Sequence, residues 1–182
     1  MLLPTIVAVL IIGLFWVISY NSLIKYRNWV RESWAQIDVQ LRRRYDLIPN
    51  LVETVKGYAK HEQETLEKVI KARNLLISPE NSPQDKIEAN NMITGALRSI
   101  FALSEAYPDL KANQNFLRLQ EELSGTENKI AYARQLYNNT VMKYNTKIQS
   151  IPTNFVATVH GFKEEQLLQI PEAERENVRV QF

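Results

Sequence analysis

The chain lacks cysteine, has only five glycines among its 182 residues, and carries no charged side chain before Lys25. The lack of cysteine excludes disulfides, a thiol nucleophile, and zinc or iron–sulfur sites with cysteine ligands, while it leaves the cellular compartment open. Scarce glycine and abundant strong helix formers favour an all-α fold. A formal net charge of +2 is too small to indicate nucleic-acid binding.

Motifs of nucleotide and hydrolytic chemistry are missing as well. The sequence contains neither a phosphate-binding glycine loop nor a G-x-S-x-G nucleophile motif. His61 begins a His-Glu-Gln-Glu sequence that superficially resembles a zinc-protease motif, but threonine occupies position 65, where that motif requires a second histidine. His160 is remote in sequence. We therefore predict a protein that is not an enzyme, with no catalytic residue, metal, cofactor or small-molecule substrate.

The uncharged N-terminal segment is apolar almost throughout, from Leu2 to Tyr20. A helix from Leu3 to Tyr20 is about 27 Å long, close to the hydrocarbon thickness of a bilayer. Trp16 and Tyr20 lie one turn apart at its far end, where amphipathic rings prefer the headgroup layer. A cleaved signal peptide is the alternative. The absence of an early Lys or Arg, and of a clear small-residue cleavage site, favours an uncleaved transmembrane anchor in residues 1–22.

Positive charge follows this segment and does not precede it. Lys25, Arg27 and Arg31 come soon after the segment, where each basic side chain gains about 1 kcal/mol from anionic headgroups. The positive-inside rule then places the N-terminus outside and the rest of the chain in the cytoplasm. We expect a single-pass protein of the cell membrane, with Trp16, Tyr20 and these three basic residues at the membrane interface.

Beyond Tyr20, apolar residues recur at steps of three, four and seven, which is the helical period. This stripe predicts that the anchor continues unbroken into a long helix that ends near Leu76 and Ile77. Pro49 lies inside the pattern, and because the stripe keeps its phase on both sides, we expect a kink there and not an end. The members of the stripe are Leu23, Val30, Trp34, Ile37, Leu41, Ile48, Leu51, Val55, Tyr58, Leu66, Val69 and Leu76.

Two further helices are expected. Ser82 is a suitable N-cap for a second helix, which has proline at its first position and ends near Ala106. A third helix should run from about Pro108 to about Ile148, because proline disfavours helical geometry at Tyr107. Asparagines at the start of this third helix are better explained by capping than by ligand binding.

Antiparallel packing of these stripes predicts an elongated cytoplasmic bundle over residues 23–151. Residues 152–182 should pack on the bundle as a C-terminal segment. The expectations for this segment are packing of Phe155 and Phe162 on the bundle, a short helix from Glu164 to Leu168, and an extended stretch at Val178, Val180 and Phe182.

Several short motifs occur in a fixed order along the chain. R-R-x-D-L-I-P-N-L-V occupies residues 43–52 and Y-P-x-L-K-A-N-x-N-F occupies residues 107–116, and further pieces continue to Gly161 and Phe162. In their order and spacing these motifs resemble the LemA family of bacterial membrane proteins, over nearly the whole chain. The resemblance implies the same cytoplasmic orientation, and it brings no catalytic residues.

Arg42, Arg43 and Arg44 form the densest basic run. On a helix they point in different directions, and counting back four residues from Ile48 places Arg44 on the apolar stripe. We expect Arg44 to meet Glu127 in a buried network that fixes helix register, with a cost of about 3–5 kcal/mol for Arg44→Met. A polar binding cleft is the alternative. The candidates for this polar core are Arg44, Asp46, Glu53, Glu127, Arg134 and Asn138.

An anchor joined to a rigid bundle favours a non-enzymatic scaffold or adaptor at the cytoplasmic membrane face. Its expected partners are the lipid bilayer and another membrane protein or a second copy of itself, and not nucleic acid. A membrane-shaping protein that assembles laterally is the first alternative. An enzyme accessory or hydrolase with an unrecognised polar site is the second.

Overall fold

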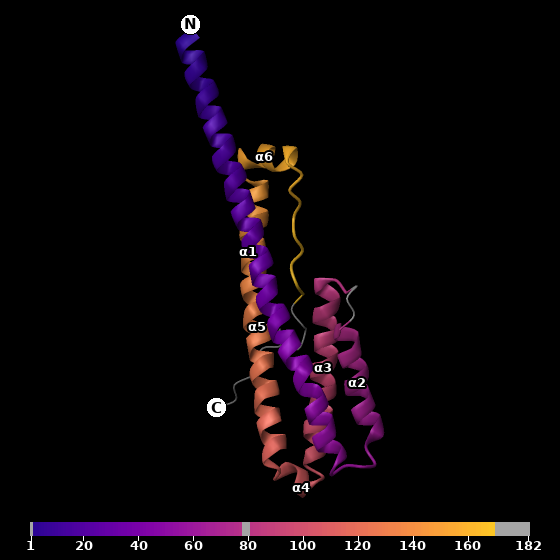
Figure 1. The fold of residues 1–182 in the computed structure, drawn as a ribbon. Helices are drawn as coiled ribbons and strands as arrows, with labels where there is room; N and C mark the ends of the chain where they lie inside the picture. Colours follow the sequence, from indigo (N-terminus) through magenta and orange to yellow (C-terminus); the bar gives the residue numbers. More distant parts are fainter. Residues whose placement is uncertain (1, 78–80, 170–182) are drawn as a thin grey trace, which may run out of the picture. The chain divides into compact units, whose positions relative to one another are not determined.

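The computed structural model describes residues 2–77 and 81–169, and all regular structure in these residues is helical (Figure 1). One long apolar helix at the N-terminus is followed by helices that pack together, which confirms the predicted all-α class. The helices are α1 (Leu2–Lys56), α2 (Gln63–Ile77), α3 (Pro83–Ser104), α4 (Pro108–Lys111), α5 (Gln114–Gln149) and α6 (Thr153–Val159).

Helix α1 runs for 55 residues, from the apolar N-terminal segment into a charged, amphipathic part. Among the described residues it is the one helix long and apolar enough, by length and composition, to cross a membrane. Most of its apolar side chains from Leu2 to Ile18 are exposed, whereas Phe15 and Trp16 are partly buried, and from Leu23 onward apolar side chains are buried on one side. The helix passes through Pro49 without ending, as expected.

Helix α1 ends at Lys56, so the prediction of an unbroken helix to Ile77 is wrong. The backbone N–H groups of Tyr58 and Ala59 both donate to the carbonyl of Val55, at 3.0 and 2.8 Å, and α2 begins only at Gln63. Ala59 is buried there, whereas Tyr58 is 42% exposed. The turn keeps apolar residues on the buried side and so preserves the spacing of the apolar stripe. The spacing alone therefore did not reveal that the helix ends at Lys56.

The chain forms two compact units, and both α1 and α5 contribute to each of them. Unit 2 comprises Ile37–Tyr132, together with Leu168 and the residue after it among those described. In this unit α2 and α3 pack together as a helical hairpin. The largest buried apolar side chains of the unit come from α1, α3 and α5: Ile37, Leu41, Ile48, Leu51, Ile87, Ile93, Leu97, Ile100 and Phe116.

Two helix starts in unit 2 are capped by side chains. Ser82 Oγ accepts from the backbone N–H of Asp85 at 3.2 Å, and the Asp85 carboxylate accepts from the N–H of Ser82 at 2.9 Å. This capping box confirms the expected start of α3. Asn113 Oδ1 accepts from the N–H of Phe116 at 3.0 Å, which confirms the capping role. The third predicted helix is therefore divided into α4 and α5 at Ala112 and Asn113.

Unit 1 consists of residues 2–36 of α1 and residues 133–167. Here α1 and α5 lie antiparallel, side by side, and α6 lies across them (Figure 1). Their contact buries one face of each helix, and the ring of Trp34 meets the ring of Tyr137 edge-on at 5.9 Å. The buried apolar side chains of this unit are Leu23, Val30, Ala133, Tyr137, Val141, Tyr144, Val156 and Ala157.

The C-terminal segment differs from the prediction in two respects. Its helix lies at Thr153–Val159, while residues 164–168 are not helical, because Glu164 and Glu165 instead bond to side chains of α5. Phe162 packs against the unit as expected, but Phe155 is exposed. The extended stretch predicted at Val178, Val180 and Phe182 lies outside the described residues.

Candidate functional site

The end of the apolar part of α1 is covered by aromatic residues from beyond α6. Trp16 Nε1 donates to Nε2 of His160 at 3.1 Å. The ring of Tyr20 lies 4.6 Å from the ring of His160 and 5.9 Å from that of Phe162, measured between centroids. Both predicted interface aromatics are therefore partly covered by their own chain, and their contacts fix the last turns of the apolar segment against α6.

The basic residues expected at the membrane interface follow on the next turns of α1. Lys25 Nζ lies 4.8 Å from the centre of the Trp29 ring, and the Arg27 guanidinium lies 5.1 Å from that of Phe162. Both distances fit cation–π contacts. Lys25 and Arg31 are exposed to solvent. The charged groups of Lys25 and Arg27 thus lie over aromatic rings, and the Arg27 side chain is partly buried there.

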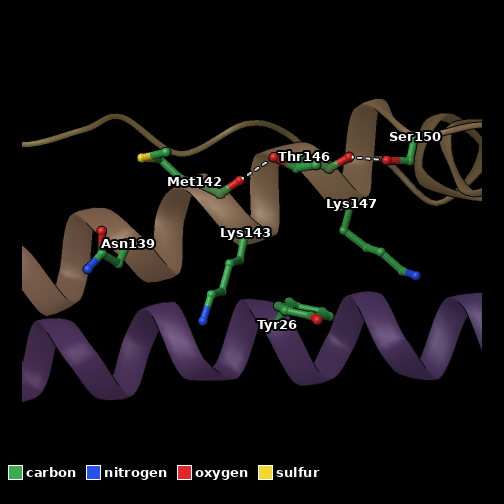
Figure 2. A pocket seen from close by; sticks show the side chains of 7 residues that line it. All are labelled: Tyr26, Asn139, Met142, Lys143, Thr146, Lys147 and Ser150. Atoms are coloured by element: carbon green, nitrogen blue, oxygen red, sulfur yellow. Dashed lines mark hydrogen bonds between the residues drawn. The ribbon is translucent and has the colours of Figure 1, made fainter.

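An open groove of about 450 Å³ lies between α1 and α5 in unit 1 (Figure 2). Tyr26 comes from α1, and Lys143 and Lys147 come from successive turns of α5 on either side of the tyrosine ring. The hydroxyls of Thr146 and Ser150 donate to carbonyls of their own helix, at 2.8 and 2.6 Å. The groove therefore presents two ammonium donors at an open surface, which is suited to contact with an anion.

Two tyrosines of α5, Tyr137 and Tyr144, are buried in unit 1. Burial raises the pKa of Tyr144 above its usual value, and the Glu165 carboxylate adds to the increase, while Arg27 and Arg31 partly offset it. Burial and Glu165 likewise raise the pKa of Tyr137. Both phenols are therefore neutral throughout the physiological pH range, and their role is in packing.

The polar core predicted around Arg44 lies in unit 2. Arg44 is 1% exposed, whereas Arg42 and Arg43 are exposed, as expected for three successive helical positions. Arg44 Nη1 donates to Oδ1 of buried Asn90 at 2.8 Å, and Nη2 lies 3.5 Å from the Glu127 carboxylate. The structure thus brings Arg44 and Glu127 together and adds Asn90.

Solvent reaches only one side of this group. The Glu127 side chain is 43% exposed, so water screens its attraction for Arg44. Burial lowers the pKa of the Arg44 guanidinium, and the Glu127 carboxylate partly offsets that effect. The short, buried hydrogen bond to Asn90 is therefore the better-defined contact of Arg44.

Two of the other candidates for the polar core, Asp46 and Glu53, do not join Arg44. Asp46 and Glu53 are exposed, and Glu53 pairs with Lys56 at 3.2 Å. They lie two and nine positions after Arg44, about 200° and 180° around the helix, and so face away from the core. Arg134 is buried and Asn138 is partly buried, and both belong to unit 1.

Two site residues escaped prediction from the sequence. Asn90 lies in a run of polar and small residues on α3 and carries no mark of burial. His160 was set aside because it is remote in sequence from any other histidine, yet its partners are aromatic rings. Among the described residues, no three His, Asp or Glu side chains gather closely enough to hold a metal ion.

The comparison with protein families settles which family this is. The family model described as LemA family matches residues 33–182, from the amphipathic part of α1 onward. The chain belongs to the LemA family. Protein LemA of Metamycoplasma hominis is 27% identical over 173 residues, which cover 93% of this chain and 79% of the relative.

Two magnetosome proteins are also similar to this LemA-family chain. Magnetosome protein MamQ 2 of Paramagnetospirillum magneticum is 22% identical over 175 residues, which cover 82% of this chain and 64% of the relative. Magnetosome protein MamQ of Magnetospirillum gryphiswaldense is 21% identical over 169 residues, which cover 79% and 62%. The chain thus spans less than two thirds of the length of these magnetosome proteins.

Proposed function

We propose that this LemA-family protein is a non-enzymatic, single-pass membrane scaffold that holds or regulates another membrane protein at the cytoplasmic face. The observation that carries the proposal is the continuity of α1. This one helix contains the apolar segment and then supplies a face to both compact units. Such a helix joins an anchor to folded, partner-accessible surfaces without a flexible linker.

The charge distribution supports the proposed orientation. Lys25, Arg27 and Arg31 lie within the range of the apolar segment in which basic residues set topology. In unit 1, Lys143 and Lys147 of α5 add positive charge beside Tyr26. Tyr26 lies on the turns of α1 where the three basic residues begin. Anionic lipids of the cytoplasmic leaflet attract such clusters.

Crosslinking in native membranes tests the scaffold role. A photoreactive amino acid is placed at Tyr132 in one full-length variant and at Met142 in another, because both side chains are well exposed. Captured proteins are then identified by mass spectrometry. We expect one recurrent membrane protein, captured from the same position in repeated experiments.

A third variant with the photoreactive residue at Ile11 controls for non-specific capture within the membrane. Capture of the same proteins from Ile11 and from Tyr132 would count against a specific scaffold contact. Ladders of self-crosslinked chains beyond a dimer would replace the scaffold with lateral self-assembly and membrane shaping.

A further inference from the structure

Helix α6 is apolar on two opposite sides. On one side, Val156 and Ala157 are buried against Leu23 of α1. On the other, Phe155 and Val159 are 62% and 67% exposed, and Ile151 just before the helix is 80% exposed. Residues four apart lie in one row along a helix, so Phe155 and Val159 form an exposed apolar row, to which we add Ile151 of the turn immediately before the helix. We call it the α6 row.

The α6 row lies in a long stretch without charge. Residues 148–162 contain no Asp, Glu, Lys or Arg, and lysines stand immediately before and after, at positions 147 and 163. A surface helix of a water-soluble unit ordinarily carries charge on its outer face. The outer face of α6 instead carries the exposed row and lacks any charged side chain.

The two uncharged stretches of unit 1 meet one another. Trp16 contacts His160, and Tyr20 contacts both His160 and Phe162. The first charged residues beyond the two uncharged stretches also lie close together. Arg27 of α1 lies over the ring of Phe162, and Lys163 is the next residue after Phe162. The structure thus aligns the charge boundary of α1 with that of the α6 segment.

We infer that α6 lies in the membrane surface, with its row inserted among lipid headgroups and the first methylenes of the acyl chains. The inference rests on α1 spanning the bilayer, as proposed above. Figure 1 shows α6 lying across α1 and not along it, as a helix in the plane of a membrane must if α1 crosses that membrane. Interfacial helices bury an apolar face by about 5–10 Å in this way.

The position of α6 selects lipid over a protein as the cover of the row. The contacts with Trp16, Tyr20 and Leu23 hold α6 at the turns of α1 where the exposed apolar side chains end. A bilayer that surrounds the exposed residues of α1 up to Ile18 therefore also reaches the α6 row. The row then sets how deeply α1 sits in the bilayer.

Spin-label accessibility in liposomes tests this placement. The chain contains no cysteine, so a single nitroxide-labelled cysteine is introduced into the full-length protein at position 151, 155 or 159. Collisions with oxygen, which concentrates in lipid, are compared with collisions with a water-soluble nickel chelate. At all three positions we expect oxygen accessibility to exceed nickel accessibility.

Two matched positions make the result decisive. Ile11, exposed within the apolar segment, should give the lipid pattern, and Leu136, exposed on α5 more than three turns before α6, should give the reverse pattern. If the α6 row resembles Leu136 while Ile11 reports lipid, the inference fails and the anchor stands. If Ile11 itself reports water, the spanning anchor fails and the inference fails with it.

Two further outcomes separate lipid from protein contact. Low accessibility to both reagents at the three positions would mean that protein covers the α6 row, which overturns the inference. Phe155→Asp in the chain labelled at Val159 should shift that label towards the water pattern, because a carboxylate opposes insertion. Since both side chains are well exposed, the substitution leaves the buried face of α6 intact.

Discussion

At the scale of single residues, Arg44 shows how exposure of one partner reduces the contribution of an ion pair to stability. The sequence suggested that losing Arg44 would leave a buried Glu127 unpaired, at a cost of about 3–5 kcal/mol. Glu127 is instead partly exposed and can be hydrated, whereas Asn90 is buried and loses its partner. Loss of Arg44 should therefore be destabilising mainly because the buried Asn90 side-chain amide is left without its partner, and not because a buried charge is left unpaired.

We expect Arg44→Met to destabilise unit 2 by about 1–3 kcal/mol, the cost of leaving one buried polar group unsatisfied. Glu127→Gln, which keeps the size of the side chain, should cost about 1 kcal/mol or less. Hydrogen exchange of backbone amides in α3 measures both. Equal effects of the two substitutions would show that the ion pair, and not the bond to Asn90, dominates.

The buried tyrosines of unit 1 predict a loss of stability at alkaline pH. The folded-state pKa values of Tyr137 and Tyr144 are raised, so the folded state binds these protons more tightly than the unfolded state. Their stabilising contribution is complete below the unfolded pKa of about 10 and is lost as pH rises through the folded values.

We therefore expect the phenolate absorbance of the eight tyrosines to rise in two stages, with the later stage accompanying the opening of unit 1. Tyr144→Phe should diminish the later stage and retain more structure above pH 10, as followed by circular dichroism. Titration of all tyrosines in one stage, with unit 1 intact, would contradict the expectation.

At the scale of elements, most helices could be predicted from apolar spacing and capping residues. The spacing located the buried faces of α1, α3 and α5, and Ser82 marked the start of α3. The break after Lys56 was missed because the stripe continues in register through the turn at Ala59. Helix α6 was missed because one of its two apolar faces has no buried partner, so its pattern fits no ordinary amphipathic helix.

The capping box gives a prediction for α3. Ser82→Ala should cost about 1 kcal/mol, because the N–H of Asp85 loses its acceptor. The hydrogen bonds from Ser82 hold the pKa of Asp85 below its usual value, so the contribution of this carboxylate is present above its unfolded pKa and is lost as pH falls through the folded one. Hydrogen exchange in the first turns of α3, measured at neutral and acidic pH, checks both effects.

Two glycines predict opposite outcomes for the same substitution. Gly161, the second residue after α6, has φ +67°, and a Cβ there would meet nothing within 4 Å. Gly161→Ala should therefore lower the free energy of unfolding by about 1 kcal/mol through backbone strain alone. Gly125 lies inside α5, and a Cβ there would likewise meet nothing within 4 Å. Gly125→Ala should therefore raise the free energy of unfolding by up to about 1 kcal/mol. Exchange rates in α6 and in α5 measure the two effects separately. Similar effects at both sites would contradict this account.

At the scale of the whole molecule, the charges that follow the apolar segment should decide its orientation. Replacing Lys25, Arg27 and Arg31 with glutamine should produce a mixed topology, because the positive-inside bias is removed. A single cysteine at Leu136 reports this through its reaction with a membrane-impermeant thiol reagent added outside the cell. We expect little labelling in the parent chain and clear labelling in the variant.

The matched control removes three exposed lysines of the folded part, Lys60, Lys68 and Lys71, far from the apolar segment along the chain. Topology should be unchanged in this variant, although the change in net charge is the same. Equal labelling in both variants would show that the orientation does not depend on the position of the charges.

The packing of Leu23 against Val156 and Ala157 also has a consequence for biosynthesis. These partners are separated by roughly 130 residues, which a ribosome adds in on the order of ten seconds. Throughout that interval the membrane-proximal face of α1 has already emerged while α6 has not yet been made. Helix α1 thus acquires the cover that α6 provides only after roughly 130 further residues have been translated.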